Sequence, residues 1–207
     1  MKDSPKPAFN RHSPRLPGYD YAQPGAYFIT IVTQGRSPLF GDILAGGMRL
    51  NPAGEMLAQV CDEMPHSLPG MGWGIYQIMP NHFHAIIELK NVGADPPNSH
   101  VGADLCVCPG QPRRVAPTDG QHTNAPTDAA QNRRLTLGDV VGRFKSLTTF
   151  RYMQGIRAGH YQPFITRLWQ RNYYEHIIRD EKDYQSIFDY IISNPHNWEK
   201  DQEYPNQ

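Results

Sequence analysis

Two histidines separated by one residue are the clearest candidates for chemistry in this sequence. They are His82 and His84, in the stretch MPNHFHAIIEL at residues 79–89. The apolar residues alternate there, which predicts a strand whose residues two apart share a face. The odd-numbered apolar stripe would face the core, and both imidazoles would lie on the other face, where they could bind one divalent cation. The alternative is a pair of half-exposed histidines that only line the sheet.

A second candidate pair lies near the end of the chain, in the stretch DEKDYQSIFDYIISNPHNW at residues 180–198. The helical spacing predicts an apolar stripe for the core, made by Tyr184, Ile187, Phe188, Ile191 and Ile192. Tyr190 and Asn194 lie outside this stripe, one helical turn apart at its border, so that both could reach into a neighbouring cleft. The alternative is a surface tyrosine and an asparagine that merely ends the helix.

Basic residues are concentrated in one part of a chain whose formal net charge is zero. Residues 131–171 hold one acidic residue, Asp139, and eight basic ones: Arg133, Arg134, Arg143, Lys145, Arg151, Arg157, Arg167 and Arg171. Aromatic residues alternate with them, a combination that suits single-stranded or hairpin nucleic acid. We therefore expect DNA contacts from Arg143, Lys145, Arg151 and Arg171, joined by Arg11 and Arg15. The alternative is a solvated basic face.

The elements that must position these residues alternate between strands and helices. Asn51 is expected to cap the first helix, Pro80 and Asn81 to form a tight turn, and Asp180 to cap the last helix, which ends before Pro195. The expected strands are 27–33, 48–50, 73–79, 83–89 and 169–174, and the expected helices are 54–64, 137–152 and the segment after Asp180. This order predicts an α+β fold, a ferredoxin-like sandwich with an antiparallel sheet.

The composition divides the chain of 207 residues. Residues 91–134 are rich in Pro and Gly and repeat the motifs VGAD and APTD, so we expect a disordered low-complexity insert. Residues 16–90 and 135–200 would then form one domain, flanked by a loose basic tail at 1–15 and a second tail at 201–207. No run of 18 apolar residues occurs, which argues against a spanning helix, and three cysteines are too few for a disulfide framework.

Five segments together resemble a known family. PNHFH is similar to the His-hydrophobic-His motif of single-tyrosine HUH transposases. Four further segments resemble the REP-associated tyrosine transposase branch of that family: RLPGYDYAQPGAYFIT at 15–30, LGDVVGRFKS at 137–146, LWQRNYYEHIIRDEKDY at 168–184 and YIISNPHNW at 190–198. The resemblance covers about residues 11–90 and 135–200 and skips the insert.

This resemblance implies a metal-dependent single-stranded DNA endonuclease and strand transferase that acts on hairpins of repeated extragenic palindromes. His82 and His84 would be metal ligands, Asn194 would complete the site around Mg or Mn, and Tyr190 would be the nucleophile that forms a 5′-phosphotyrosine. Tyr173 and Tyr174 rank lower as nucleophiles, since neither has an amide four residues later.

Two rival functions are weighed beside this one. The first is a catalytically inactive protein that only binds DNA hairpins. The second is a structural zinc site made by His82, His84, Cys106 and Cys108, for which CxC is an unusual spacing. Monomer and homodimer are equally compatible with the sequence. We expect a cytoplasmic bacterial protein, associated with the nucleoid, with DNA and no membrane as its partner.

Overall fold

The computed structural model describes residues 16, 18–91 and 134–205. The predicted basic tail and residues 92–133 of the low-complexity segment, including Cys106 and Cys108, lie outside the described residues. The described elements are β1 (Gly25–Val32), η1 (Gln34–Arg36), β2 (Gly41–Leu44), β3 (Gly47–Leu50), α1 (Pro52–Ser67), β4 (Met71–Ile78), β5 (His82–Leu89), α2 (Leu137–Arg157), β6 (Tyr174–Ile178), α3 (Glu181–Ser193) and η3 (Pro195–Lys200).

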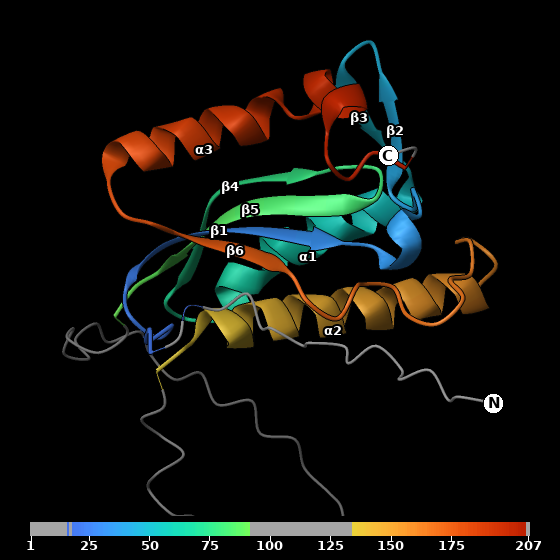
Figure 1. Ribbon diagram of the computed structural model, residues 1–207. Helices are drawn as coiled ribbons and strands as arrows, with labels where there is room; N and C mark the ends of the chain where they lie inside the picture. Colours follow the sequence, from blue (N-terminus) through green and yellow to red (C-terminus); the bar gives the residue numbers. More distant parts are fainter. Residues whose placement is uncertain (1–15, 17, 92–133, 206–207) are drawn as a thin grey trace, which may run out of the picture. The chain divides into compact units, whose positions relative to one another are not determined.

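Four of the strands form one antiparallel sheet in the order β4-β5-β1-β6. The β2–β3 hairpin forms a separate two-stranded sheet. Without that hairpin the chain order is β-α-β-β-α-β, with the first and third strands at the centre of the sheet, which is the ferredoxin-like arrangement. Figure 1 shows α1 and α2 on one face of the sheet and α3 on the other. The predicted α+β, ferredoxin-like fold is confirmed.

The main core lies between the sheet and the layer of α1 and α2. Strand β5 contributes Phe83, Ala85, Ile87 and Leu89 to it, as the alternation predicts, and all four are buried. Because the side-chain period of a strand is two, the same register turns His82, His84 and Ile86 toward α3.

The interface between α3 and the sheet is smaller, and the predicted stripe on this helix is only partly right. Ile191 is fully buried there beside Phe28 and Ile86. Ile192 was expected in the stripe but is 55% exposed. The apolar patch that the sheet offers to α3 is small and centred on Phe28 and Ile86, and Ile192 lies at the outer edge of the stripe, exposed to solvent.

The helix starts follow the local sequence. The Asn51 side chain accepts hydrogen bonds from the backbone of Ala53 and Gly54 and caps α1, and Asp180 caps α3 by accepting from the backbone of Asp183, both as predicted. These caps set where each helix begins and therefore which of its residues meet the sheet.

The expected strand at residues 169–174 is wrong. Trp169 forms only an isolated bridge with Thr33, and the edge strand β6 begins at Tyr174. The aromatic character of this segment has another cause, since the buried indole of Trp169 packs in the core and donates to Thr148 Oγ1 at 2.9 Å. Strand β2 was not predicted. None of the helices in the described part of the chain has the length and apolar character needed to cross a membrane.

Candidate active site

The two histidines lie at the start of β5, directly after the turn at Pro80 and Asn81. His82 is fully buried and His84 is 2% exposed, so they are not the half-exposed residues of the alternative interpretation. Their Nε2 atoms are only 2.9 Å apart. The pair therefore forms one compact centre beneath α3.

Asn81 determines which nitrogen of His82 carries the proton. The Nδ2 group of Asn81 donates to the backbone oxygens of Arg36 at 3.1 Å and Glu203 at 2.7 Å, so its Oδ1 must be the atom that faces His82. His82 Nδ1 lies 2.9 Å from that oxygen and donates to it. The Nε2 of His82 is then an unprotonated acceptor aimed at His84.

Thr30 supports the His84 ring without fixing its tautomer, because its Oγ1 lies 2.9 Å from His84 Nδ1. A hydroxyl can donate or accept, so Thr30 is compatible with either tautomer of His84. When His84 Nδ1 donates to Thr30, both Nε2 lone pairs meet in the same place, and a cation between them removes their repulsion. Outer hydrogen bonds of this kind orient metal-binding histidines.

Both imidazoles are neutral at ordinary pH. Burial lowers the pKa of His82 to about 3, although the neighbouring Asn194 side chain acts in the opposite direction. Burial also lowers the pKa of His84 well below its ordinary value, and the proximity of His82 adds to this effect. Neutral imidazole is the form that binds metal ions.

Asn194 directs an unused oxygen toward this centre. Its Nδ2 donates to Asp201 Oδ2 at 2.8 Å, which leaves Oδ1 on the other side of the amide. Asn194 is 2% exposed, and this buried Oδ1 has no hydrogen-bond partner among the described residues. Such an orphaned acceptor is costly unless a cation or a donor meets it. Asn194 is therefore well placed for the metal-binding role that we predict.

Asp201 is the residue that the sequence interpretation missed. It is 7% exposed, and a ligand atom from each of His82, His84 and Asp201 lies within 4.8 Å of the others. These three side chains could hold a metal ion. The sequence interpretation placed Asp201 in the tail at 201–207, after the last predicted helix. The sequence feature that could have pointed to a ligand is an acidic residue directly after the HNWEK stretch at 196–200.

Tyr190 stands at the open side of the centre. Its ring lies 5.3 Å from the His84 ring and 6.0 Å from the Phe28 ring, and its hydroxyl donates to Asp201 Oδ2 at 3.4 Å. The residue is 44% exposed and lines a cavity that opens to solvent. Burial of the ring, and then the negative charge of Asp201, raise the pKa of Tyr190 to about 12.

A cavity of about 570 Å³ opens onto these groups. His84, Tyr190, Asn194 and Asp201 line it, and so does Tyr174 from the first position of β6. Tyr174 is 56% exposed and is thus a second phenol in the same cavity, whereas Tyr173 lies beneath the Lys145 ammonium group.

The predicted DNA-binding residues are not grouped around this cavity. Arg143 and Lys145 belong to α2, on the opposite face of the sheet, and Arg11 and Arg15 lie outside the described residues. Lys145 is half-buried and donates to the backbone oxygens of Gln170, Arg171 and Asn172 at 2.9, 3.3 and 3.1 Å. These hydrogen bonds connect α2 to the loop that precedes β6.

Arg151 also has a partner within the protein. Its guanidinium forms a two-pronged ion pair with Glu63 of α1, at 2.9 and 2.5 Å. Arg143 and Arg171 are exposed. Contact of any of these basic residues with DNA remains a prediction.

Comparison with known proteins gives the following result. No family model matches the chain. The structure of a REP-associated tyrosine transposase bound to a REP hairpin aligns with a TM-score of 0.48 and 18% identity, covering 89% of this chain and 75% of that one. A transposase candidate from Deinococcus radiodurans R1 aligns with a TM-score of 0.39 and 16% identity, covering 88% and 97%.

One curated relative is much closer in sequence. An uncharacterized protein of Haemophilus influenzae is 37% identical over 196 residues, which cover 94% of this chain and 93% of the relative. Similarity of this degree over nearly the full length of both chains shows common descent. The chain therefore belongs to the same protein family as this Haemophilus influenzae protein.

Proposed function

We propose that this protein is a metal-dependent nuclease and strand transferase that cuts single-stranded DNA through a 5′-phosphotyrosine at Tyr190. One observation carries the proposal: the Nε2 atoms of His82 and His84 converge at 2.9 Å, and the accessible Tyr190 phenol lies beside them. Two buried neutral imidazoles, an orphaned amide oxygen and a tyrosine have no common structural purpose, whereas phosphodiester cleavage uses all of them.

The donor set fits a divalent cation. His82 and His84 supply two nitrogens, and Asp201 and Asn194 can supply oxygens, a mixture that suits Mn²⁺ and, with added water, Mg²⁺. A cation bound there would neutralise charge on the scissile phosphate and lower the barrier to nucleophilic attack. Burial keeps the two imidazoles neutral and away from water. The hydrogen bonds to Asn81 and Thr30 orient their rings.

Tyr190 and Asp201 would share the proton transfer. The Tyr190 hydroxyl donates to Asp201, so its proton can pass to that carboxylate as the phenolic oxygen attacks phosphorus. The new bond joins Tyr190 to phosphorus, the bond from phosphorus to the 3′ oxygen breaks, and the departing 3′ oxygen takes a proton from solvent water. A 3′-OH can later attack the phosphotyrosine and rejoin the strand without ATP, because one ester replaces another.

The substrate class follows from the sequence resemblance described above. Five segments similar to REP-associated tyrosine transposases favour hairpins of repeated extragenic palindromes, with single-stranded DNA at the cleavage point. The alternative function is hairpin binding without cleavage. The complete set of His82, His84 and Tyr190 favours an enzyme, because a protein that only binds has no need to keep a reactive phenol beside two metal-binding imidazoles.

The deciding experiment is a cleavage assay with covalent trapping. Chelator-treated protein is incubated with a labelled hairpin that has single-stranded extensions, with Mn²⁺, Mg²⁺ or EDTA, and adducts are separated on a denaturing gel. We expect an adduct only with the metal ion. Mass spectrometry after nuclease trimming should place the nucleotide on the peptide that contains Tyr190.

Tyr174 offers a matched control, because it is a phenol in the same cavity. Tyr190→Phe should abolish the adduct, and Tyr174→Phe should retain it. An adduct on Tyr174, or a normal yield from Tyr190→Phe, would refute the assignment. Binding without any adduct under every metal condition would favour the hairpin-binding alternative.

A further inference from the structure

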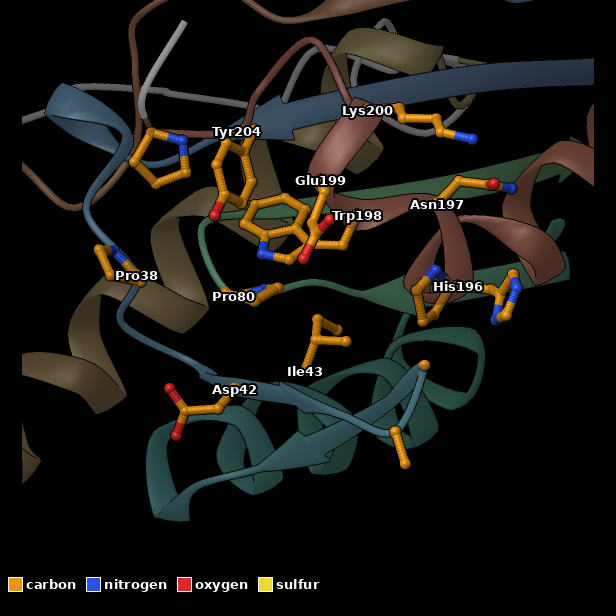
Figure 2. A pocket seen from close by; sticks show the side chains of 14 residues that line it. Pro38, Asp42, Ile43, Pro80, His196, Asn197, Trp198, Glu199, Lys200 and Tyr204 are labelled. Atoms are coloured by element: carbon orange, nitrogen blue, oxygen red, sulfur yellow. The ribbon is translucent and has the colours of Figure 1, made fainter.

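A second cavity, of about 540 Å³, lies between the β2–β3 hairpin and η3 (Figure 2). Figure 2 shows Trp198 and Tyr204 on one side, Ile43 on the other, and Pro80 between them. Pro38 extends the apolar part of the lining, which also holds two acidic residues, Asp42 and Glu199, and one lysine, Lys200. The Trp198 indole gives the cavity one flat apolar surface among polar groups, which fits a flat heterocyclic ring with polar edges.

This cavity is next to the active site. The ring of Trp198 lies 5.7 Å from the ring of His82, and Trp198 lines the cavity whereas His82 does not, so the indole separates the two. Asn197 and Lys200 line both this cavity and the one that contains Tyr190. A strand that crosses the active site could therefore continue past these two residues.

The two sides of the cavity, the β2–β3 hairpin and η3, are positioned by contacts within the protein. The β2–β3 turn has positive φ at Ala45 and Gly46, which is typical of a tight two-residue hairpin. A Cβ at Gly46 would lie 2.7 Å from His196 Nδ1, so the hairpin turn and the His196 side chain of η3 are in close contact. A preformed cavity loses little entropy when it is filled.

We propose that this cavity binds one unpaired base of the DNA strand, next to the phosphate that enters the active site. The base would stack on the ring of Trp198, with the Tyr204 ring, inclined at 71° to it, at the edge of the stack, and Lys200 would face the connecting phosphate. The inference rests on the proposed function for its ligand class. Stacking on an aromatic side chain is a sequence-tolerant way to hold a single strand, and it would position the scissile bond relative to His82.

The test fills the cavity from the side away from the catalytic residues. Ile43→Trp places a ring in the cavity, and Leu44→Trp is the matched control, because Leu44 is the adjacent residue, is 50% exposed and does not line the cavity. Binding of a fluorescent hairpin with single-stranded extensions is measured by anisotropy in EDTA. We expect Ile43→Trp to weaken binding about tenfold and Leu44→Trp to leave it unchanged.

An abasic scan then locates the base. Each extension nucleotide is replaced in turn by an abasic site; one position should weaken wild-type binding about tenfold and have no further effect on Ile43→Trp. Circular dichroism verifies folding, and Ile43→Phe replaces Ile43→Trp if the larger ring unfolds the protein. The inference would be overturned if Ile43→Trp and Leu44→Trp bound the hairpin with equal affinity. It would also be overturned if every abasic position weakened binding equally in the wild type and in Ile43→Trp.

The two proposals fail separately. Because the binding assay contains EDTA, it does not depend on cleavage. Coupling between Ile43→Trp and one abasic position, without any covalent adduct in metal, would leave the base site standing and reject the nuclease. A Tyr190 adduct without such coupling would do the reverse.

Discussion

Thr30 and His84 are direct partners across the β1–β5 pair, and the threonine Oγ1 lies 2.9 Å from the imidazole Nδ1. Thr30 is 8% exposed. Among the described residues, its hydroxyl is the one hydrogen-bond partner of His84 Nδ1. On its Nδ1 side, the His84 ring is therefore oriented by this hydroxyl.

Thr30→Val should weaken metal binding while the protein stays folded. Valine has the shape of threonine but cannot accept the Nδ1 proton, so the His84 ligand loses its support, and we expect Mn²⁺ affinity to fall about 10- to 100-fold. Isothermal titration of chelator-stripped protein measures this. Thr148→Val is the control, because Thr148 is a buried threonine of α2 that bonds to Phe144 and Trp169. Equal affinities of the two variants would contradict the prediction.

Asp201→Asn should also weaken metal binding, for a different reason. The amide keeps the shape of the carboxylate but removes its negative charge from a group whose ligand atoms lie within 4.8 Å of one another. We expect at least a tenfold loss of Mn²⁺ affinity, together with a lower adduct yield. Glu203→Gln is the control, since Glu203 pairs with Arg36 and is not one of the three grouped ligands. If Glu203→Gln lost as much affinity, the assignment of Asp201 would fail.

The buried histidines make stability depend on pH when metal is absent. The pKa of His82 is about 3 in the folded protein, against an ordinary value of 6.5, so between these values the unfolded state binds more protons. The free energy of unfolding should therefore fall as pH falls from 7 to 5, by about 2 kcal/mol for one such histidine. His84 acts in the same direction.

Urea unfolding in EDTA at pH 7 and pH 5 measures this loss. His82→Gln should reduce the difference between the two pH values, whereas His66→Gln, which alters an exposed histidine of α1, should not. A wild-type protein that is equally stable at both pH values would show that His82 is not held neutral by burial.

The exposed arginines should contribute to DNA affinity more than the paired one. Arg143→Gln and Arg171→Gln should each weaken hairpin binding and reduce the slope of log affinity against log salt by about one, since each charge releases about one counterion. Arg151→Gln should have a smaller effect, because Glu63 already neutralises that charge. Binding titrations at several salt concentrations measure the slopes. A larger effect for Arg151 would mean that its ion pair opens to meet DNA.

Removal of residues 95–130 should leave a folded protein that still cuts DNA. Their Pro content and short repeats cannot supply a packed core, so the domain formed by the flanking residues should not need them. Thermal denaturation and the adduct assay check this. A deletion variant that folds but forms no adduct would show that the segment takes part in the reaction.

The features that could be predicted are those that short stretches of sequence determine. A period of two placed His82 and His84 on one face of a strand and Phe83 and Ala85 on the other, and a single asparagine marked the start of α1. Such patterns depend on neighbours along the chain. They were enough to derive the ferredoxin-like order of elements, in spite of the missed hairpin strand β2.

The features that escaped prediction depend on residues that are far apart in sequence. Asp201 reaches the site only because η3 follows α3 and turns back over it. Lys145 looked like a surface cation, yet its charge is satisfied by backbone oxygens about 25 residues later. Trp169 looked like a strand residue because aromatic residues serve strands and cores equally well, and the core contact was decisive.

The double hydrogen bond of Asn81 has a consequence for the order of folding. Its amide joins the backbone of Arg36 to that of Glu203, and these partners are 45 and 122 residues away from it. Contacts between such distant parts of a chain are slow to form, because a large loop must close first. The β4–β5 hairpin, which carries both histidines, is local and can form early. The group of His82, His84 and Asp201 is therefore expected to assemble late in folding, after the β4–β5 hairpin has brought the two histidines together.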